Sequence, residues 1–283
     1  MNSDNELAPD RMPVIDVHAH VFPHKILEKA VAAISTFYDD LPMHTDGSLE
    51  MLKTRMQQHG VDKTIVFTTA TTKSQVASIH GFIHTLQEES GGKLIGFGTL
   101  HPDMTEIEIE EEINNILRLG LKGIKLHPDF QHIAADSSAV FSMAELAQGR
   151  LPLLIHAGDY RHGFSHPEQI RRLAAAYPKL TVIAAHFGGW SQWYKSPDQL
   201  AGLPNVYVDT SSSLAFLSEE KVRELIKRFG DEHVLFGSDY PMWDVGAELA
   251  GIRHLGLPEE SLRKILHDNA AALFSISSLS SRT

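Results

Sequence analysis

Eight short apolar runs recur along the 283-residue chain, and each is followed by a longer segment with helical periodicity. The runs are nearly continuous in apolar content, which is typical of parallel strands buried on both faces. From the second run onward they end at residues 69, 100, 127, 156, 186, 210 and 239. This matches the spacing of about 31 residues per unit in a barrel of about 250 residues. The predicted strands span residues 13–18, 63–69, 94–100, 122–127, 152–157, 180–186, 205–210 and 233–239.

This repetition predicts an α/β fold, a (β/α)8 TIM barrel formed by a single domain over residues 13–275. An open, doubly wound sheet is the alternative, because repetition alone does not prove that the first and last strands meet. Only the first unit, residues 18–69, is long, and we expect it to pass over the mouth of the barrel. Residues 1–12 and 276–283 are expected to be flexible ends.

The composition narrows the class of protein. The chain has no cysteine, which excludes disulfides and thiolate metal sites. Its net charge is −11, and so negative a surface repels phosphate backbones, so nucleic acid is not an expected partner. No apolar stretch approaches the roughly 20 residues of a membrane span, and the polar start "MNSDNELAPDR" lacks the apolar centre of a signal peptide. We expect a cytoplasmic protein that acts on a small molecule, with a homo-oligomer left open.

Metal-binding side chains stand at the ends of the apolar runs, which in a barrel meet at one open face. His18 and His20 follow the first run, and in a strand residues i and i+2 point to the same face. Asp239 ends the very apolar last run, where a carboxylate is an unpaired buried charge unless it meets a cation or caps a helix. The remaining groups, for which a hydrogen-bonded core role stays open, are Lys125, His127, His156 and His186.

These segments together resemble the amidohydrolase superfamily. More narrowly they are similar to its amidohydrolase-related branch, which includes aminocarboxymuconate-semialdehyde and resorcylate decarboxylases as well as hydrolases. A TatD-type deoxyribonuclease would share the histidine pair, but it has a glutamate where this chain has "GIKLH". The resemblance runs from Ile15 to Phe274 and rests on "DVHAHVFP", "GIKLHPDFQ", "LLIHAG", "AHFGG", "FGSDYP" and "ILHDNAAALF".

The resemblance implies a metal centre in which His186 activates a metal-bound water. Imidazole and carboxylate ligands suit Zn²⁺, with Mn²⁺ or another divalent ion as the alternative. One ion is preferred to two; in a two-ion site a carbamylated Lys125 would bridge the metals, whereas an unmodified Lys125 would help to bind the substrate. The implied ligands of the single ion are His18, His20, His156 and Asp239.

The first function that the resemblance implies is a hydrolase. His186 and Asp239 would deprotonate the metal-bound water, which attacks a carbonyl carbon, and Asp239 would pass the proton to the leaving group. The runner-up is a non-oxidative decarboxylase that uses the same metal, and a non-catalytic metal-binding barrel is a third possibility. The candidates for anchoring a substrate carboxylate are Lys125, Arg161 and Tyr240.

Overall fold

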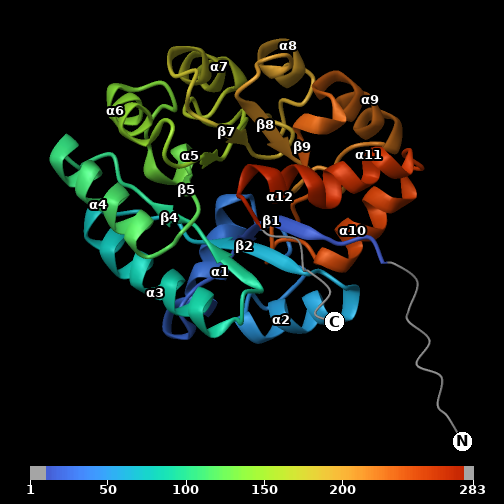
Figure 1. Ribbon diagram of the computed structural model, residues 1–283, viewed down its shortest axis with the longest axis horizontal. Helices are drawn as coiled ribbons and strands as arrows, with labels where there is room; N and C mark the ends of the chain where they lie inside the picture. Colours follow the sequence, from blue (N-terminus) through green and yellow to red (C-terminus); the bar gives the residue numbers. More distant parts are fainter. Residues whose placement is uncertain (1–10, 277–283) are drawn as a thin grey trace, which may run out of the picture.

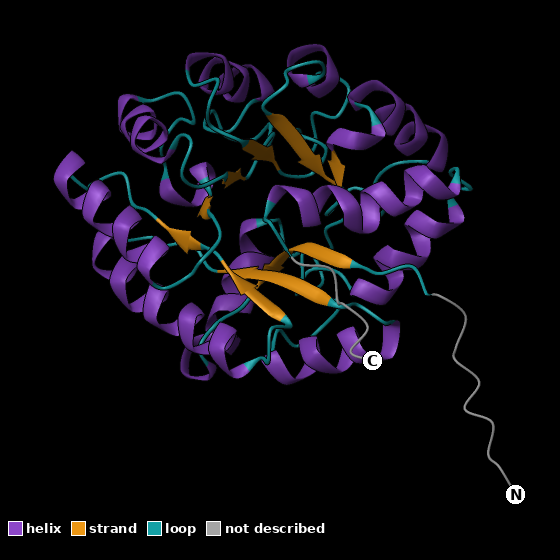
Figure 2. Ribbon diagram, viewed as in Figure 1, coloured by secondary structure: helices purple, strands orange, loops and turns teal. Residues whose placement is uncertain are grey.

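Strands lie at the centre of the molecule and helices form a ring around them (Figures 1 and 2). The computed structural model describes residues 11–276, so nearly all of the two predicted flexible ends lies outside the described residues. All strand pairings are parallel within this range. The strands are β1 (Ile15–His20), β2 (Lys63–Phe67), β3 (Leu94–Gly96), β4 (Gly98–Thr99), β5 (Ile124–Leu126), β6 (Leu153–Ile155), β7 (Val182–Ala184), β8 (Val206–Asp209) and β9 (Val234–Leu235).

The third predicted strand, residues 94–100, is interrupted at Phe97 and forms both β3 and β4. The N–H of Phe97 still donates to the carbonyl of Val66 on β2, at 3.0 Å. The next N–H, of Gly98, turns to the opposite neighbour and donates to the carbonyl of Gly123 at 2.9 Å. The interruption therefore joins the sheet β1-β2-β3 to the sheet β4-β5-β6-β7-β8-β9.

The barrel closes where β1 meets the segment that follows β9. His20 N–H donates to the carbonyl of Tyr240 at 2.7 Å, and Asp239 N–H donates to the carbonyl of His18 at 2.8 Å. Ala19 and Tyr240 form an isolated parallel bridge at the same place. The first and last strands thus meet, and the predicted barrel is confirmed over the open sheet.

The helices begin and end where the sequence provides caps. Ser48 accepts a hydrogen bond from the Met51 N–H at the start of α2, and Gly60 ends that helix with a φ of 68°. Ser218 caps α9 in the same way.

The long α-helices are α1 (Leu27–Phe37), α2 (Leu49–His59), α3 (Val76–Glu89), α4 (Glu106–Arg118), α6 (Ser138–Ala147), α7 (Pro167–Ala176), α9 (Glu219–Phe229) and α10 (Val245–His254). The short ones are α5 (Pro128–Gln131), α8 (Ser196–Leu200), α11 (Glu259–Arg263) and α12 (Asn269–Leu273). None of the helices within residues 11–276 has the length and apolar character needed to cross a membrane.

The core has separate parts. One large cluster packs the helices against the outside of the strands. A second cluster joins side chains from β1, β2, β6, β7 and β9 with Phe97 and with Phe274 at the end of α12, so it fills the barrel interior. A third, small cluster contains Ile34, Tyr38 and Met242 and lies over the mouth of the barrel. The long first unit therefore covers the mouth, as expected, through α1 and Tyr38.

Candidate active site

A bulge in β1 points both of its histidines into the barrel. The pairing of β1 with β2 runs Ile15 to Lys63 and Asp16 to Thr64, but then Ala19 to Val66, so β1 contains one extra residue. Ile15 belongs to the interior core, and strict alternation from it would turn His18 and His20 outward. The Asp16 carboxylate accepts the His18 N–H at 3.0 Å, which satisfies a donor that the bulge leaves outside the ladder.

His18, His20 and Asp239 form a group with one possible ligand atom each, all within 4.8 Å of one another. Asp239 Oδ1 lies 3.3 Å from His18 Nε2 and 3.5 Å from His20 Nε2. All three side chains are buried. Burial lowers the pKa of both imidazoles well below the ordinary value, with the Lys125 charge adding to the effect, so both rings are neutral and can offer a lone pair.

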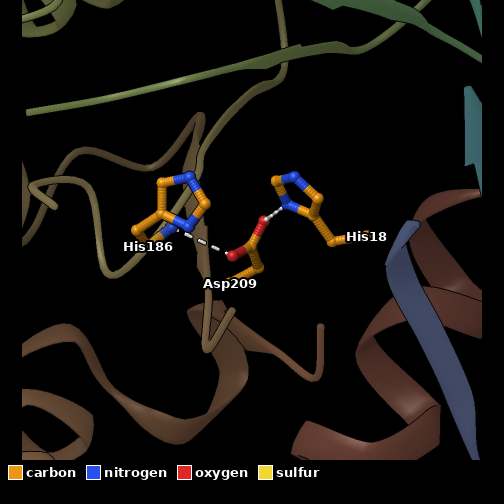
Figure 3. Close-up of side chains that lie close together, drawn as sticks. All are labelled: His18, His186 and Asp209. Atoms are coloured by element: carbon orange, nitrogen blue, oxygen red, sulfur yellow. Dashed lines mark hydrogen bonds and ion pairs between the residues drawn. The ribbon is translucent and has the colours of Figure 1, made fainter. Parts of the chain in front are cut away.

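Asp209, which the sequence reasoning missed, fixes the orientation of His18. Figure 3 shows its carboxylate between His18 and His186. It accepts from His18 Nδ1 at 2.8 Å and from the backbone N–H of His186 at 3.0 Å. Because Nδ1 is the donor, the lone pair of His18 lies on Nε2, which faces Asp239. The missed signal was available: Asp209 ends the apolar run "NVYVDT" just as Asp239 ends the last run.

His156 stands apart from this group. His186 Nδ1 donates to the Ser211 carbonyl at 3.0 Å, so its Nε2 accepts from His156 Nδ1, also at 3.0 Å. The remaining nitrogen of His156, Nε2, is buried without a hydrogen-bond partner among residues 11–276 and lies 3.6 Å from Asp129 Oδ2. It carries a free lone pair, but its role as a ligand of the same ion stays a prediction.

His186 lies beside the group, with Nδ1 3.9 Å from Asp239 Oδ2. Burial is the main cause that lowers its pKa to about 4, so its imidazole is neutral. Three residues here, His186, Ser212 and Asp239, adopt left-handed φ values of 61°, 48° and 62°. Such backbone costs free energy and concentrates at functional sites. The Ser212 hydroxyl donates to Asp239 Oδ2, and the Trp243 indole N–H donates to Ser212 Oγ at 2.7 Å, so the carboxylate is held from a second side.

Of the three predicted substrate anchors, only Lys125 lies at this site. Its Nζ is 3.3 Å from His18 Nε2, and burial lowers its pKa to about 8. The Arg161 guanidinium is instead paired with Asp159 and Asp39, at 2.7 Å each. The Tyr240 hydroxyl donates to the Ser48 carbonyl at 2.6 Å. Arg161 and Tyr240 are thus paired within the protein in this structure, and their roles as substrate anchors stay predictions.

A small cavity of about 10 Å³ adjoins Asp239 and is roofed by aromatic side chains. His127 stacks between Phe130 and His156, with ring centroids 3.7 and 4.0 Å away. Its Nδ1 accepts the Phe130 N–H, so its Nε2 donates to the Tyr38 oxygen at 3.1 Å. The hydroxyl hydrogen of Tyr38 is not used in this contact and stays available to another acceptor.

The amidohydrolase family model matches residues 15–276. The chain belongs to the amidohydrolase family. Its fold is similar to that of an uncharacterized TIM-barrel protein, Bb4693 from Bordetella bronchiseptica, with a TM-score of 0.77 at 18% identity over 93% of this chain and 98% of that one. Comparison with curated proteins found no match.

Two decarboxylases share the barrel fold of this amidohydrolase. One is 5-carboxyvanillate decarboxylase LigW from Sphingomonas paucimobilis, with a TM-score of 0.71 at 18% identity over 94% of this chain and 100% of that one. The other is a dihydroxybenzoic acid decarboxylase from Polaromonas sp. JS666 with bound manganese and the inhibitor 2-nitroresorcinol, with a TM-score of 0.71 at 16% identity over 94% and 97%.

The residues of this amidohydrolase fit a divalent metal. His18 and His20 are neutral, and the Asp209 carboxylate behind His18 is the kind of hydrogen-bond partner that orients metal-binding histidines. The Lys125 ammonium already places a positive charge against His18 Nε2. Imidazole and carboxylate donors suit zinc and manganese alike, so the donor set indicates a divalent ion without choosing between the two.

Proposed function

We propose that this amidohydrolase is a non-oxidative decarboxylase of an aromatic or conjugated carboxylic acid. One divalent metal, zinc or manganese, would be held by His18, His20 and Asp239, with His156 as the further predicted ligand. The observation that carries the proposal is the cavity beside Asp239, whose walls include the flat rings of Tyr38, His127 and Phe130. Flat side chains of this kind favour a flat substrate.

Two proteins of the same fold support this choice over hydrolysis. LigW is named as a decarboxylase of 5-carboxyvanillate, and the Polaromonas protein as a decarboxylase of dihydroxybenzoic acid. Both matches cover more than nine-tenths of each chain. Hydroxylated benzoic acids are therefore the first substrates to try.

In the reaction, the bond between the ring carbon and the carboxylate breaks, CO₂ leaves, and a proton takes its place on the ring carbon. Asp239 is the proposed carrier of this proton, because its carboxylate borders the cavity and Ser212 holds it in place. A bound divalent ion would supply positive charge to hold the oxygens of the acid. Lys125 adds a second, buried positive charge on the floor of the site.

The roof over the cavity also suits this chemistry. Tyr38 and Ile34, from the segment that crosses the mouth, close the cavity above Asp239. The closed volume of about 10 Å³ is too small for a benzoate, so the roof must move to admit the substrate. Closing it again would exclude water, which decarboxylation does not consume. The free hydroxyl hydrogen of Tyr38 can then donate to a substrate oxygen.

Hydrolysis is the second candidate, and one observation favours it. The Asp239 carboxylate lies 3.9 Å from Nδ1 of the neutral His186 imidazole, and this carboxylate could deprotonate a water molecule held beside His186. The two reactions differ in their products, so one experiment separates them.

The test supplies the manganese- or zinc-loaded protein with hydroxybenzoic acids labelled with ¹³C in the carboxyl group, and with the corresponding anilides. We expect labelled CO₂ and the decarboxylated phenol in equal amounts, lost in Asp239→Asn and kept in the matched control Asp103→Asn, whose side chain is exposed. Cleaved anilide with ¹⁸O from the solvent, and no CO₂, would assign the protein to the hydrolases. If no acid releases CO₂ and no anilide is cleaved, the protein does not act on this class of substrates, and the proposal is refuted.

A further inference from the structure

A second and much larger cavity, of about 680 Å³, opens beside the catalytic one. It lies between α1 and α3, next to the loop that follows β2. His20, Ile34 and Phe130 line both cavities, so the two are separated only by side chains. Its volume is within the range of about 300–1,000 Å³ typical of sites for small molecules. The hydroxybenzoic acids considered above do not need this space.

The lining of the larger cavity is mostly apolar. Ile34 and Phe37 face it from α1, and Ile79 and Phe82 face it from α3. Ile26 at its border has 49% of its surface exposed, although it is a large aliphatic residue. An exposed apolar surface of this kind marks a place where another apolar group binds.

Besides His20 and His132, the polar side chains that line this cavity are Lys29, Thr68, Thr69, Thr71, Gln75 and Ser78. Lys29 is exposed on α1. On the strand side, beside Thr68, the hydroxyl of Thr69 is buried and has no hydrogen-bond partner within residues 11–276.

We propose that this cavity holds an extended apolar substituent of the substrate, whose carboxylate end reaches the site at His20. The proposal rests on the proposed function, since the bound end is the acid that would lose CO₂. A small molecule is favoured over a protein segment because the cavity lies directly against the buried catalytic cavity, separated from it only by side chains that include His20. The substrate class is then a benzoic or conjugated acid with a chain of several carbons.

The test measures binding, so it does not depend on turnover. The probes are 4-alkoxybenzoates from methoxy to hexyloxy, titrated by calorimetry into the metal-loaded protein. Each methylene group buried in an apolar cavity contributes about a fourfold decrease in Kd. We expect this gradient to continue over several carbons in the wild-type protein. A Kd that does not change with chain length overturns the proposal, whatever the variants do.

Two substitutions in α1 test whether the decrease in Kd with chain length arises in the larger cavity. Ala33 and the neighbouring Ala32 are both exposed, but only Ala33 lines the larger cavity. Ala33→Trp should fill the cavity and abolish the gradient while methoxybenzoate still binds, and Ala32→Trp should preserve it. A gradient unchanged in a folded Ala33→Trp would place the chain elsewhere and refute this assignment. A protein that shows the gradient but releases no CO₂ would refute the proposed function and leave the binding site in place.

Discussion

The two ends of the barrel interior are equally buried but are built from opposite kinds of residue. At one end Val17, Ile65 and Phe97 pack into an apolar core with α12 behind them. At the other end Lys125 and Asp209 are fully buried yet charged or polar. Apolar packing needs only matching shapes, whereas each buried polar group must find a partner. The comparison indicates that one end of this barrel holds the fold together and the other is arranged for chemistry.

Strand β1 runs from the apolar end of the barrel interior to the polar end. Its bulge lies where the inward-facing residues change from apolar to polar. Before the bulge Ile15 and Val17 face the apolar core, and after it His18 and His20 face the polar end. Asp16 stabilises this joint by accepting from the His18 N–H and from both the N–H and the hydroxyl of Ser238. If the comparison is right, substitutions at the polar end should reduce turnover, and those at the apolar end should reduce stability. The variants below are ordered from the largest expected loss of turnover to the smallest.

Asp239→Asn should cause the largest loss. It removes the proposed proton carrier and a proposed oxygen ligand of the metal, so we expect kcat to fall by about 10²–10⁴-fold. Steady-state CO₂ release, with metal content measured on the same sample, checks this. Retention of more than a tenth of the wild-type rate would mean that Asp239 carries no proton.

Asp209→Asn should have the next largest effect, through His18. The amide can no longer act as a purely accepting partner for His18 Nδ1, and losing such a partner typically weakens metal binding by about 10–100-fold. Competition against a fluorescent chelator gives the metal affinity, with Asp103→Asn as the exposed control. An unchanged affinity would show that His18 does not depend on Asp209.

Asp16→Asn tests the joint between the two ends. One of its oxygens becomes a donor that faces Ser238, so we expect the free energy of unfolding to fall by about 1–3 kcal/mol. Turnover should fall less than in Asp209→Asn, because Asp16 acts on the histidines only through the backbone. Urea denaturation and kcat, measured together, separate the two effects. A loss of turnover as large as that of Asp239→Asn would contradict this ranking.

Phe97→Ala should leave turnover per folded molecule unchanged. It opens a cavity in the apolar end, where a loss of about 3–5 kcal/mol of unfolding free energy is expected. Denaturant titration gives the stability, and active-site titration with metal gives the folded fraction. A variant that stays stable but turns over slowly would show that the two ends are not separable.

The sequence predicted the parts of the fold that depend on local patterns. The spacing of the apolar runs predicted the barrel, which closes between Ala19 and Tyr240 in the structure. The interruption at Phe97 was not predicted, because an apolar run reads the same whether its hydrogen bonds go to one neighbour or change sides. The bulge in β1 was missed for the same reason, although the expectation that His18 and His20 share a face agrees with the structure.

The site was only partly predictable for reasons of long-range geometry. A strand-end position indicates which face a residue reaches, but not which nitrogen of His156 faces which neighbour. Tyr38 carries no motif, and it enters the site only because α1 crosses the mouth of the barrel. The sequence position of Arg161 does not reveal that its guanidinium pairs with Asp39 and Asp159, and its role as a substrate anchor stays a prediction.

Anomalous diffraction from crystals of the manganese-loaded protein tests the central claim most directly. The account predicts one strong peak within bonding distance of His18 Nε2, His20 Nε2 and Asp239 Oδ1. The possible ligand atoms of His18, His186 and Asp209 also lie within 4.8 Å of one another. A peak between these three residues, or no peak at the polar end of the barrel, would contradict the account.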